Sequence, residues 1–343
     1  MQWALYRQPA GEPSHVETVA LITKKQHQNP YLSECAFDCC RLEGDTMQYV
    51  PMSENLSFSR IVQGFWHLTR WNYTKDERIA FIEGCIDRGV TTFDTAEVYG
   101  NTECERQLGE AFRTRPDLRK KIQLVSKAGI YKTQINGNTF GYYDTTYDRL
   151  MQSCKEALCR LQCEYLDLYL IHREDPCMDP YEAARALADM KKQGLIREAG
   201  VSNFDPFKFQ ALNTAMGGAL RTNQIEWNPV CFEHFDSGMM DLLLQERIHP
   251  MIWSPLAGGK LFTSSEEIYV KARSKIQEIA QRHEVEPETI VYAWLMYHPV
   301  GALPISGSSK LERLDLAVKA LDVKLERWEW YEIYTASGQK VLR

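Results

Sequence analysis

The stretch GVTTFDTAEVYGNTECERQLGEAFR, residues 89–113, contains one complete strand–loop–helix unit. The apolar run 90–94 predicts a short buried strand, and residues 103–113 predict a helix. Asp94 ends the strand, and Tyr99 lies in the loop that follows it. Both side chains could simply hydrogen-bond the backbone of their own loop. Alternatively, they belong to an active site whose other members lie further along the chain.

The same alternation of strand and helix continues from residue 61 to residue 321. Short apolar strands followed by longer amphipathic helices favour parallel strands joined by crossovers. Strands are expected at 60–65, 90–94, 121–129, 165–172, 195–204, 221–228, 248–256 and 301–308. Eight such units over roughly 270 residues fit a (β/α)8 TIM barrel, whose usual size is about 250 residues. The competing architecture, a doubly wound sheet, usually has a G-x-G-x-x-G turn after its first strand, and this chain has none.

The two ends of the chain differ from this repeating part. Residues 1–46 lack steady periodicity, and we expect an extension of uncertain structure, with Met47 as a possible natural start. Residues 48–52 and 56–60 flank a turn at 53–55 and predict an N-terminal β-hairpin. The expected barrel domain is therefore 47–325, followed by a C-terminal tail at 326–343.

Composition excludes several classes of function. The chain of 343 residues is 44% hydrophobic and 25% charged, with a formal net charge of −6, as expected for a globular protein without a nucleic-acid or membrane partner. No apolar run approaches the ~20 residues of a membrane helix. The start lacks the pattern of a secretory signal. Ten cysteines occur without C-x-x-C or zinc-finger spacing, which predicts reduced thiols in a cytoplasmic protein and no metal site.

Ionisable side chains follow three successive expected strands. In TIM barrels the active site forms at the carboxyl ends of the strands, where this chain places Asp94, Lys127 and His172, with Tyr99 nearby. A free tyrosine has a pKa near 10, and a neighbouring Lys127 would lower that pKa by stabilising the phenolate. Asp94 would keep the lysine charged, and His172 could hydrogen-bond the same oxygen as Tyr99. Such a group can protonate a developing alkoxide while another agent delivers a hydride.

Seven motifs occur in order along the chain: FDTAEVYG, LVSKAG, LDLYLIHRED, GVSNF, TNQIEWNP, WSPLAGGKL and PISGSSKLERL. Over residues 47–325 the chain resembles the aldo-keto reductase family, and most of all its bacterial oxidoreductase branch with HRxDP after the fourth strand. The resemblance implies a barrel that binds NADPH without a Rossmann domain. It also implies a catalytic tetrad of Asp94, Tyr99, Lys127 and His172, with Tyr99 as the proton donor.

The resemblance further implies a set of cofactor contacts. Ser202, Asn203 and Gln224 would hold the nicotinamide carboxamide, and Trp227 would stack on the nicotinamide. Trp253, Ser254, Leu256, Gly258 and Leu261 would lie along the pyrophosphate, and Ser306, Gly307, Ser308, Lys310 and Arg313 would surround the 2′-phosphate. Independently, residues 307–309 are expected to open a helix, whose N-terminus attracts phosphate. NADP(H) is expected rather than NAD(H), because no acidic residue is recognised here that would bind a ribose 2′-hydroxyl.

Two features concern the periphery of this site. Many relatives have an acid–amide pair that contacts the adenine, at the positions of Leu316 and Ala317 in this chain. Around the substrate, Trp66, His67 and Trp227 are expected to line an aromatic pocket. Phe65, Trp71 and the aromatic residues of the loop 128–147 could add to it, or could pack that loop onto the barrel.

The sequence thus predicts an NADPH-dependent reductase of an aldehyde or ketone, a small-molecule substrate that the sequence does not specify further. A second possibility is a redox-sensing regulatory subunit, because potassium-channel β-subunits share this fold and hold NADPH. A metal-dependent hydrolase barrel is disfavoured, since no His-x-His occurs at a strand end. The oligomeric state is left open.

Overall fold

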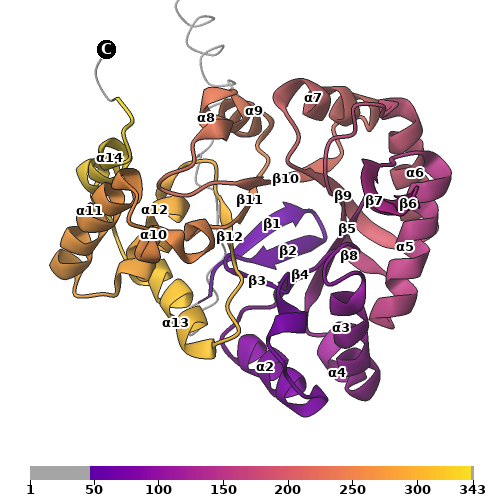
Figure 1. Ribbon diagram of the computed structural model, residues 1–343, viewed down its shortest axis with the longest axis horizontal. Coiled ribbons are helices and arrows are strands. Elements are labelled where there is room, and N and C mark those ends of the chain that lie inside the picture. Colours follow the sequence, from indigo (N-terminus) through magenta and orange to yellow (C-terminus); the bar gives the residue numbers. More distant parts are fainter. Residues whose placement is uncertain (1–46, 341–343) are drawn as a thin grey trace, which may run out of the picture. The chain divides into compact units, whose positions relative to one another are not determined.

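Eight strands form a closed parallel barrel in the computed structural model, which describes residues 47–340 (Figure 1). The strands are β3 (Val62–Gly64), β4 (Thr92–Asp94), β5 (Gln123–Ala128), β8 (Leu166–Ile171), β9 (Ile196–Ser202), β10 (Leu220–Glu226), β11 (Met251–Trp253) and β12 (Leu303–Ser306). Each pairs with its neighbour in parallel, and β12 pairs with β3 to close the ring. The predicted (β/α)8 barrel is confirmed. The expected extension at 1–46 lies outside the described residues.

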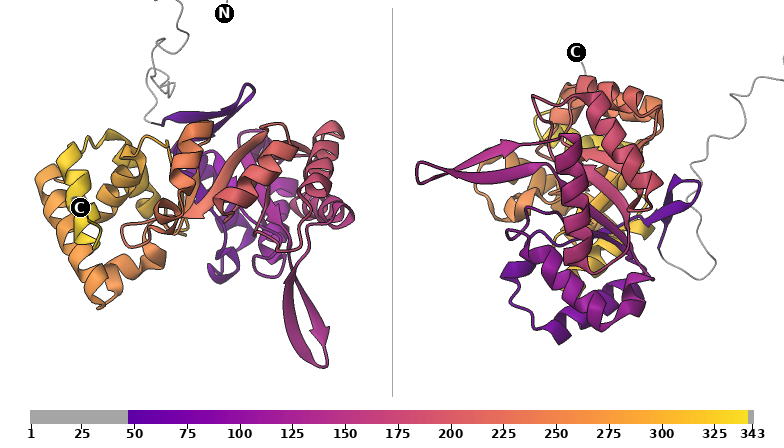
Figure 2. Two further views of the ribbon diagram at one scale, coloured as in Figure 1. Left: turned by 90° about the horizontal axis from the view of Figure 1, so that it is seen from above. Right: turned by 90° about the vertical axis from the view of Figure 1, so that its right-hand side faces the viewer.

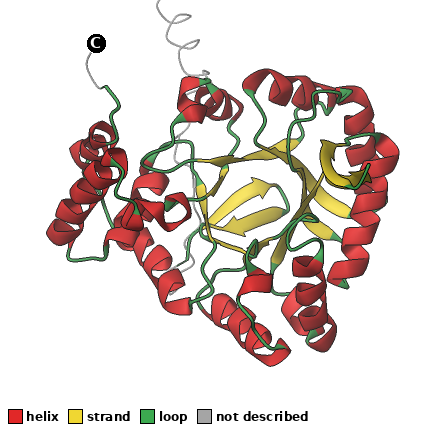
Figure 3. Cartoon of the chain, viewed as in Figure 1, coloured by secondary structure: helices red, strands yellow, loops and turns green. Residues whose placement is uncertain are grey.

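Helices surround the barrel (Figure 3). They are α2 (Lys75–Asp87), α3 (Glu103–Thr114), α4 (Pro116–Arg119), α5 (Tyr147–Leu161), α6 (Pro180–Lys192), α7 (Pro206–Ala215), α8 (Glu233–Asp236), α9 (Met239–Glu246), α10 (Lys260–Thr263), α11 (Glu267–His283), α12 (Pro287–Tyr297), α13 (Leu311–Lys319) and α14 (Arg327–Ala336). Several begin where the sequence provides a cap. Thr74 forms a capping box with Glu77, while Asp179 and Asp205 cap helices whose first residue is proline.

A β-hairpin closes one end of the barrel. Strands β1 (Tyr49–Ser53) and β2 (Leu56–Ser59) pair antiparallel, as the sequence predicts. Four buried side chains of the hairpin, Val50, Met52, Leu56 and Phe58, form one core with barrel residues Val62, Val125, Leu168, Leu170, Met251, Leu303 and Ile305. The hairpin also bonds to the amino end of β4, because the Ser59 backbone N–H donates to the Thr92 hydroxyl at 2.9 Å. The open end of the barrel is therefore the end where the strands terminate.

The segment expected to be a C-terminal tail contains the helix α14. Its Trp330 stacks on Trp294 of α12 with ring centroids 5.2 Å apart. Each of the two indole N–H groups donates to the backbone carbonyl of the other residue, at 3.0 and 3.1 Å. Glu329 adds an ion pair with Arg282 and a 2.8 Å hydrogen bond with His283, both residues of α11. Residues 327–336 are thus packed onto the helical layer of the barrel.

A second hairpin extends away from the barrel where the sequence suggested a loop (Figure 2). Strands β6 (Ile130–Ile135) and β7 (Asn138–Tyr143) pair antiparallel around Asn136 and Gly137, whose φ angles of 51° and 79° are those of a type I′ turn. Tyr131 is buried at the base and shares a 2.8 Å hydrogen bond with Ser153 of α5. Most side chains further out are exposed.

Candidate active site

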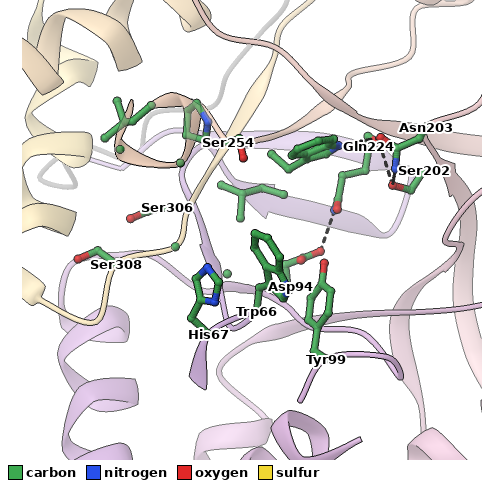
Figure 4. Close-up of a pocket in the computed structure, with 18 of the residues that line it drawn as sticks. Trp66, His67, Asp94, Tyr99, Ser202, Asn203, Gln224, Ser254, Ser306 and Ser308 are labelled. Atoms are coloured by element: carbon green, nitrogen blue, oxygen red, sulfur yellow. Dashed lines mark hydrogen bonds between the residues drawn. The ribbon is translucent and has the colours of Figure 1, made fainter. Parts of the chain in front are cut away.

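Lys127 joins two of the other predicted catalytic residues at the carboxyl ends of the strands. Its ammonium group is fully buried and donates hydrogen bonds to the Asp94 carboxylate at 2.7 Å and to the Tyr99 hydroxyl at 3.3 Å. The Thr95 carbonyl accepts a third hydrogen bond at 2.8 Å. Figure 4 shows the Tyr99 hydroxyl pointing toward Asp94. The strand ends of β4 and β5 thus bring together residues that are 33 positions apart in sequence.

The electrostatics of this cluster keep Lys127 charged and Tyr99 protonated. Burial lowers the pKa of Lys127, but Asp94 and Tyr99 together raise this pKa above its usual value. Burial raises the pKa of Tyr99, and the charge of Lys127 opposes that rise without cancelling it. The sequence predicted the direction of the lysine effect, but it did not include the larger effect of burial. Tyr99 is therefore a neutral phenol with a proton to give.

His172 lies beside Tyr99 and is neutral. The two rings meet edge to face with centroids 5.6 Å apart. The pKa of His172 is well below its usual value, because burial and the nearby charges of Lys127 and Arg173 disfavour the imidazolium. No hydrogen bond joins the side chains of His172 and Tyr99 among the described residues, and the buried Nδ1 atom of His172 has no partner there.

The ends of β9 and β10 add amide groups to the same site. The Gln224 side-chain amide donates to Asp94 at 2.8 Å, which links this strand directly to the tetrad (Figure 4). The Ser202 hydroxyl donates to the Gln224 carbonyl at 2.9 Å, and the Asn203 amide donates to the Ser202 hydroxyl at 2.7 Å. The Trp253 indole N–H donates to the Asn203 side-chain oxygen at 2.8 Å. The structure brings Ser202, Asn203 and Gln224 together, as expected. It also joins Trp253 to them, whereas Trp253 was expected along the pyrophosphate.

The prediction for Trp227 is wrong. This side chain is fully buried and packs against Trp294, Phe235 and His298 in the helical layer, so it does not line the cavity. Trp227 follows the last residue of β10, where the chain has left the barrel and its side chain enters the layer outside it. Trp253, at the end of β11, lines the cavity beside Asn203 instead.

A cavity of about 690 Å³ extends from the tetrad along the open end of the barrel. Most of the predicted cofactor-binding residues line it, namely Ser202, Asn203, Gln224, Trp253, Ser254, Leu256, Gly258, Ser306, Gly307, Ser308 and Arg313. Two others do not: Leu261 is buried, and Lys310 is exposed outside the cavity as the N-cap of α13. The helix begins at Leu311 rather than at Gly307. Around the substrate end, Trp66 and His67 line the cavity with their rings stacked, 4.3 Å between centroids.

Several lining residues were not predicted from the sequence. Ile130 and Lys132 come from the base of the protruding hairpin, and Arg173 comes from the loop after β8. Glu288 and Tyr292 come from α12, and burial raises the pKa of Tyr292 to about 12. Glu288 is an acidic residue in the same cavity as Ser308 and Arg313, where no acid was recognised from the sequence. Glu288 and Tyr292 are one helical turn apart and so lie on the same face of α12. This spacing was the only sign in the sequence that both could line the cavity, and no motif marks that face.

The cavity suits an elongated polar cofactor. Its volume lies within the range of ligand pockets, and polar groups converge on it from the tetrad at one end and from residues 306–308 at the other. Among residues 47–340, no cluster of His, Cys, Asp and Glu could hold a metal ion. In the same described part of the chain, no helix is long and apolar enough to span a membrane.

The chain belongs to the aldo/keto reductase family, whose family model matches residues 60–337. Oxidoreductase YdhF of Escherichia coli (strain K12) is 40% identical over 281 residues, which cover 82% of this chain and 94% of YdhF. The uncharacterized oxidoreductase YcsN of Bacillus subtilis (strain 168) is 39% identical, with coverage of 84% and 98%. A 6-dehydroglucose reductase of Agrobacterium fabrum is 36% identical, with coverage of 86% and 100%.

Solved structures of the same family resemble the described fold. An aldo/keto reductase from Klebsiella pneumoniae in complex with NADP and acetate superimposes with a TM-score of 0.68 at 25% identity, with 84% of this chain and 95% of the other covered. A thermostable aldo-keto reductase, Tm1743, in complex with the inhibitor epalrestat gives a TM-score of 0.71 at 26% identity, with coverage of 84% and 99%. The protein is thus a barrel of the aldo/keto reductase family, and its cavity lies at the carboxyl ends of the strands, as expected.

Proposed function

We propose that this protein is an NADPH-dependent reductase that converts an aldehyde or ketone to an alcohol. The observation that supports this most directly is the position of Lys127, 2.7 Å from Asp94 and 3.3 Å from the Tyr99 hydroxyl, at one end of a cavity long enough for a cofactor. A charged lysine next to a neutral phenol is the arrangement that proton donation to a developing alkoxide requires.

The chain's own residues would perform the proton transfer. Bound NADPH would supply a hydride to the carbonyl carbon. The Tyr99 hydroxyl donates its proton to the carbonyl oxygen, and the tyrosinate that forms is stabilised by the Lys127 ammonium group. Asp94 holds that ammonium in place through the buried ion pair. Neutral His172, beside the Tyr99 ring, orients the carbonyl oxygen before the proton moves.

Most of the cofactor contacts proposed from the sequence fit the cavity, while Trp227, Leu261 and Lys310 lie outside it. The side chains of Ser202, Asn203 and Gln224 lie at the tetrad end, where a nicotinamide carboxamide needs donors and acceptors. Trp253 replaces Trp227 as the aromatic residue for the nicotinamide face. At the far end, Ser306 to Ser308 and the Arg313 guanidinium would bind the 2′-phosphate, for which arginine offers a bidentate grip. The Klebsiella neighbour in complex with NADP supports the same cofactor.

The substrate would enter between the protruding hairpin and the loop after β3. Trp66 is 57% exposed there, and Ile130, Lys132 and Arg173 complete a chamber with both apolar and cationic walls. Such walls suit a small polar carbonyl compound. Because one relative is named a 6-dehydroglucose reductase, sugar aldehydes belong in the substrate panel beside simple aldehydes and diketones.

The test is the substitution Tyr99→Phe, followed by optical measurement of NADPH oxidation with that panel. Removal of the proton donor should lower kcat by roughly 10²- to 10⁴-fold. The dissociation constant of NADPH should stay within about twofold, since the phenol lies at the reacting end only. Tyr142→Phe, on the exposed part of the hairpin, is the matched control and should leave kcat unchanged.

Two results would count against the proposal. Full turnover by Tyr99→Phe would remove the role given to this hydroxyl. Tight NADPH binding by the unmodified protein without turnover of any carbonyl would instead favour the regulatory-subunit alternative.

A further inference from the structure

Glu288 is an acidic residue in the proposed cofactor cavity, and its side chain has no partner within the described part of the chain. It lies in the first turn of α12, is partly buried, and lines the cavity at the same end as Ser308, Arg313 and Leu316. No hydrogen bond or ion pair of its carboxylate occurs among residues 47–340. The next residue, Thr289, donates a hydrogen bond to the Leu316 carbonyl at 3.0 Å, which fixes this turn of α12 against α13.

In the open cavity, water can solvate the partly exposed Glu288 carboxylate. A cofactor that displaces this water would have to supply a hydrogen-bond donor, because an ionised carboxylate only accepts hydrogen bonds. The carboxylate would repel a 2′-phosphate, so we look for the donor in another part of the adenosine. The adenine carries an exocyclic amine, which is a neutral donor with two N–H groups. Leu316 lines the same end of the cavity and offers an apolar surface to the flat face of that ring.

We propose that Glu288 binds the adenine of the cofactor by accepting a hydrogen bond from its exocyclic amine. This inference rests on the proposed use of NADP(H). It assigns adenine recognition to α12, in a chain that has Leu316 and Ala317 at the α13 positions where many relatives have an acid–amide pair. Glu288 would then determine which base the cavity accepts, while Arg313 would determine the preference for a cofactor with a 2′-phosphate over one without it.

A simpler role for Glu288 gives different expectations. An acid in the first turn of a helix is favoured by the helix dipole without any ligand. Glu286, the exposed N-cap residue of the same helix, experiences the same dipole but does not line the cavity. Glu286→Gln is therefore the matched control, because it removes one negative charge from the same helix terminus.

The experiment measures dinucleotide binding to the full chain, without substrate, by titration calorimetry. The ligands are NADPH, NADH and the hypoxanthine analogue of NADPH, in which a carbonyl oxygen replaces the amine. For the unmodified protein and for Glu286→Gln, we expect the hypoxanthine analogue to bind about tenfold or more weakly than NADPH, because two acceptors would face each other. Glu288→Gln can donate to that oxygen, so the two affinities should become equal within about twofold.

Three outcomes would overturn the inference. One is an unchanged preference for adenine in Glu288→Gln, and another is the same change in Glu286→Gln. The third is tighter NADPH together with weaker NADH in Glu288→Gln, which would place the acid at the ribose 2′-position instead. Failure of the unmodified protein to bind any of the dinucleotides is a distinct result, because it would refute the proposed function itself.

Discussion

Lys127 is the residue whose burial and contacts give the strongest support for the proposed chemistry. A fully buried ammonium group is costly to desolvate, and a buried ion pair often contributes little net stability. Here the pair with Asp94 also holds the ammonium within 3.3 Å of a phenol at the open end of the barrel. A purely structural lysine would not need such a neighbour. The arrangement therefore supports the proposed proton transfer more than a purely stabilising role.

Arg313 and Lys310 separate two explanations of cofactor preference. Arg313 lines the cavity, whereas Lys310 is exposed outside it, so only the arginine can contact a 2′-phosphate directly. We expect Arg313→Ala to weaken NADPH binding at least tenfold and NADH binding by less than about twofold, as the loss of a charge-assisted hydrogen bond implies. Lys310→Ala should change NADPH affinity by a few-fold at most. Binding titrations with both cofactors would measure this, and equal losses for NADPH and NADH in Arg313→Ala would contradict the assignment.

Sequence reasoning succeeded for residues whose position follows from the strands. Asp94, Lys127 and His172 could be placed together because the carboxyl ends of parallel barrel strands meet at one end. Trp227 and Glu288 could not be placed in this way. Whether a side chain just beyond a strand turns into the cavity or into the helical layer depends on packing between elements distant in sequence, such as Trp227 against α12.

At the scale of elements, the protruding hairpin was identifiable in part. Asn136–Gly137 is the preferred dipeptide of a type I′ turn, which predicts a hairpin. The aromatic residues around it instead suggested a loop near the substrate. In the structure only the base of the hairpin belongs to the cavity, through Ile130 and Lys132. Tyr131 fixes that base by its hydrogen bond to Ser153 and by the guanidinium of Arg149, 3.9 Å from the ring centroid. The outer half has no such contacts to the barrel.

The outer half of this hairpin should therefore be dispensable for folding and cofactor binding. Deleting residues 134, 135, 138 and 139 leaves the paired residues Thr133 and Phe140 next to the Asn136–Gly137 turn, in the same hydrogen-bonding phase. We expect the melting temperature to change by only a few degrees and the NADPH dissociation constant by less than about twofold. Calorimetry and binding titration measure both quantities. Lys132→Ala is the comparison, since it should change KM for the substrate, and a large loss of NADPH affinity in the deletion variant would show that the hairpin tip matters to the site.

At the scale of the whole molecule, the described part of the chain forms a closed barrel with its own hydrophobic core. The barrel closes on itself between β12 and β3, the hairpin β1–β2 fills its amino end, and α14 packs onto its helical layer. Met47, the first described residue, is 1% exposed and belongs to the main core. The family model begins at residue 60, inside this unit.

We therefore expect the fragment 47–343 to fold and to bind NADPH as the full chain does. Urea unfolding should give free energies that agree within about 1 kcal/mol, since the fragment keeps all the described core residues, from Met47 onward. A fragment starting at residue 61 is the matched comparison. It lacks Val50, Met52, Leu56 and Phe58, whose burial is worth about 1.5–3 kcal/mol each. Their summed contribution is comparable to the entire stability of a typical domain, about 5–15 kcal/mol, so this shorter fragment should fail to fold. An insoluble or inactive 47–343 fragment would show instead that residues 1–46 contribute to the fold or to the site.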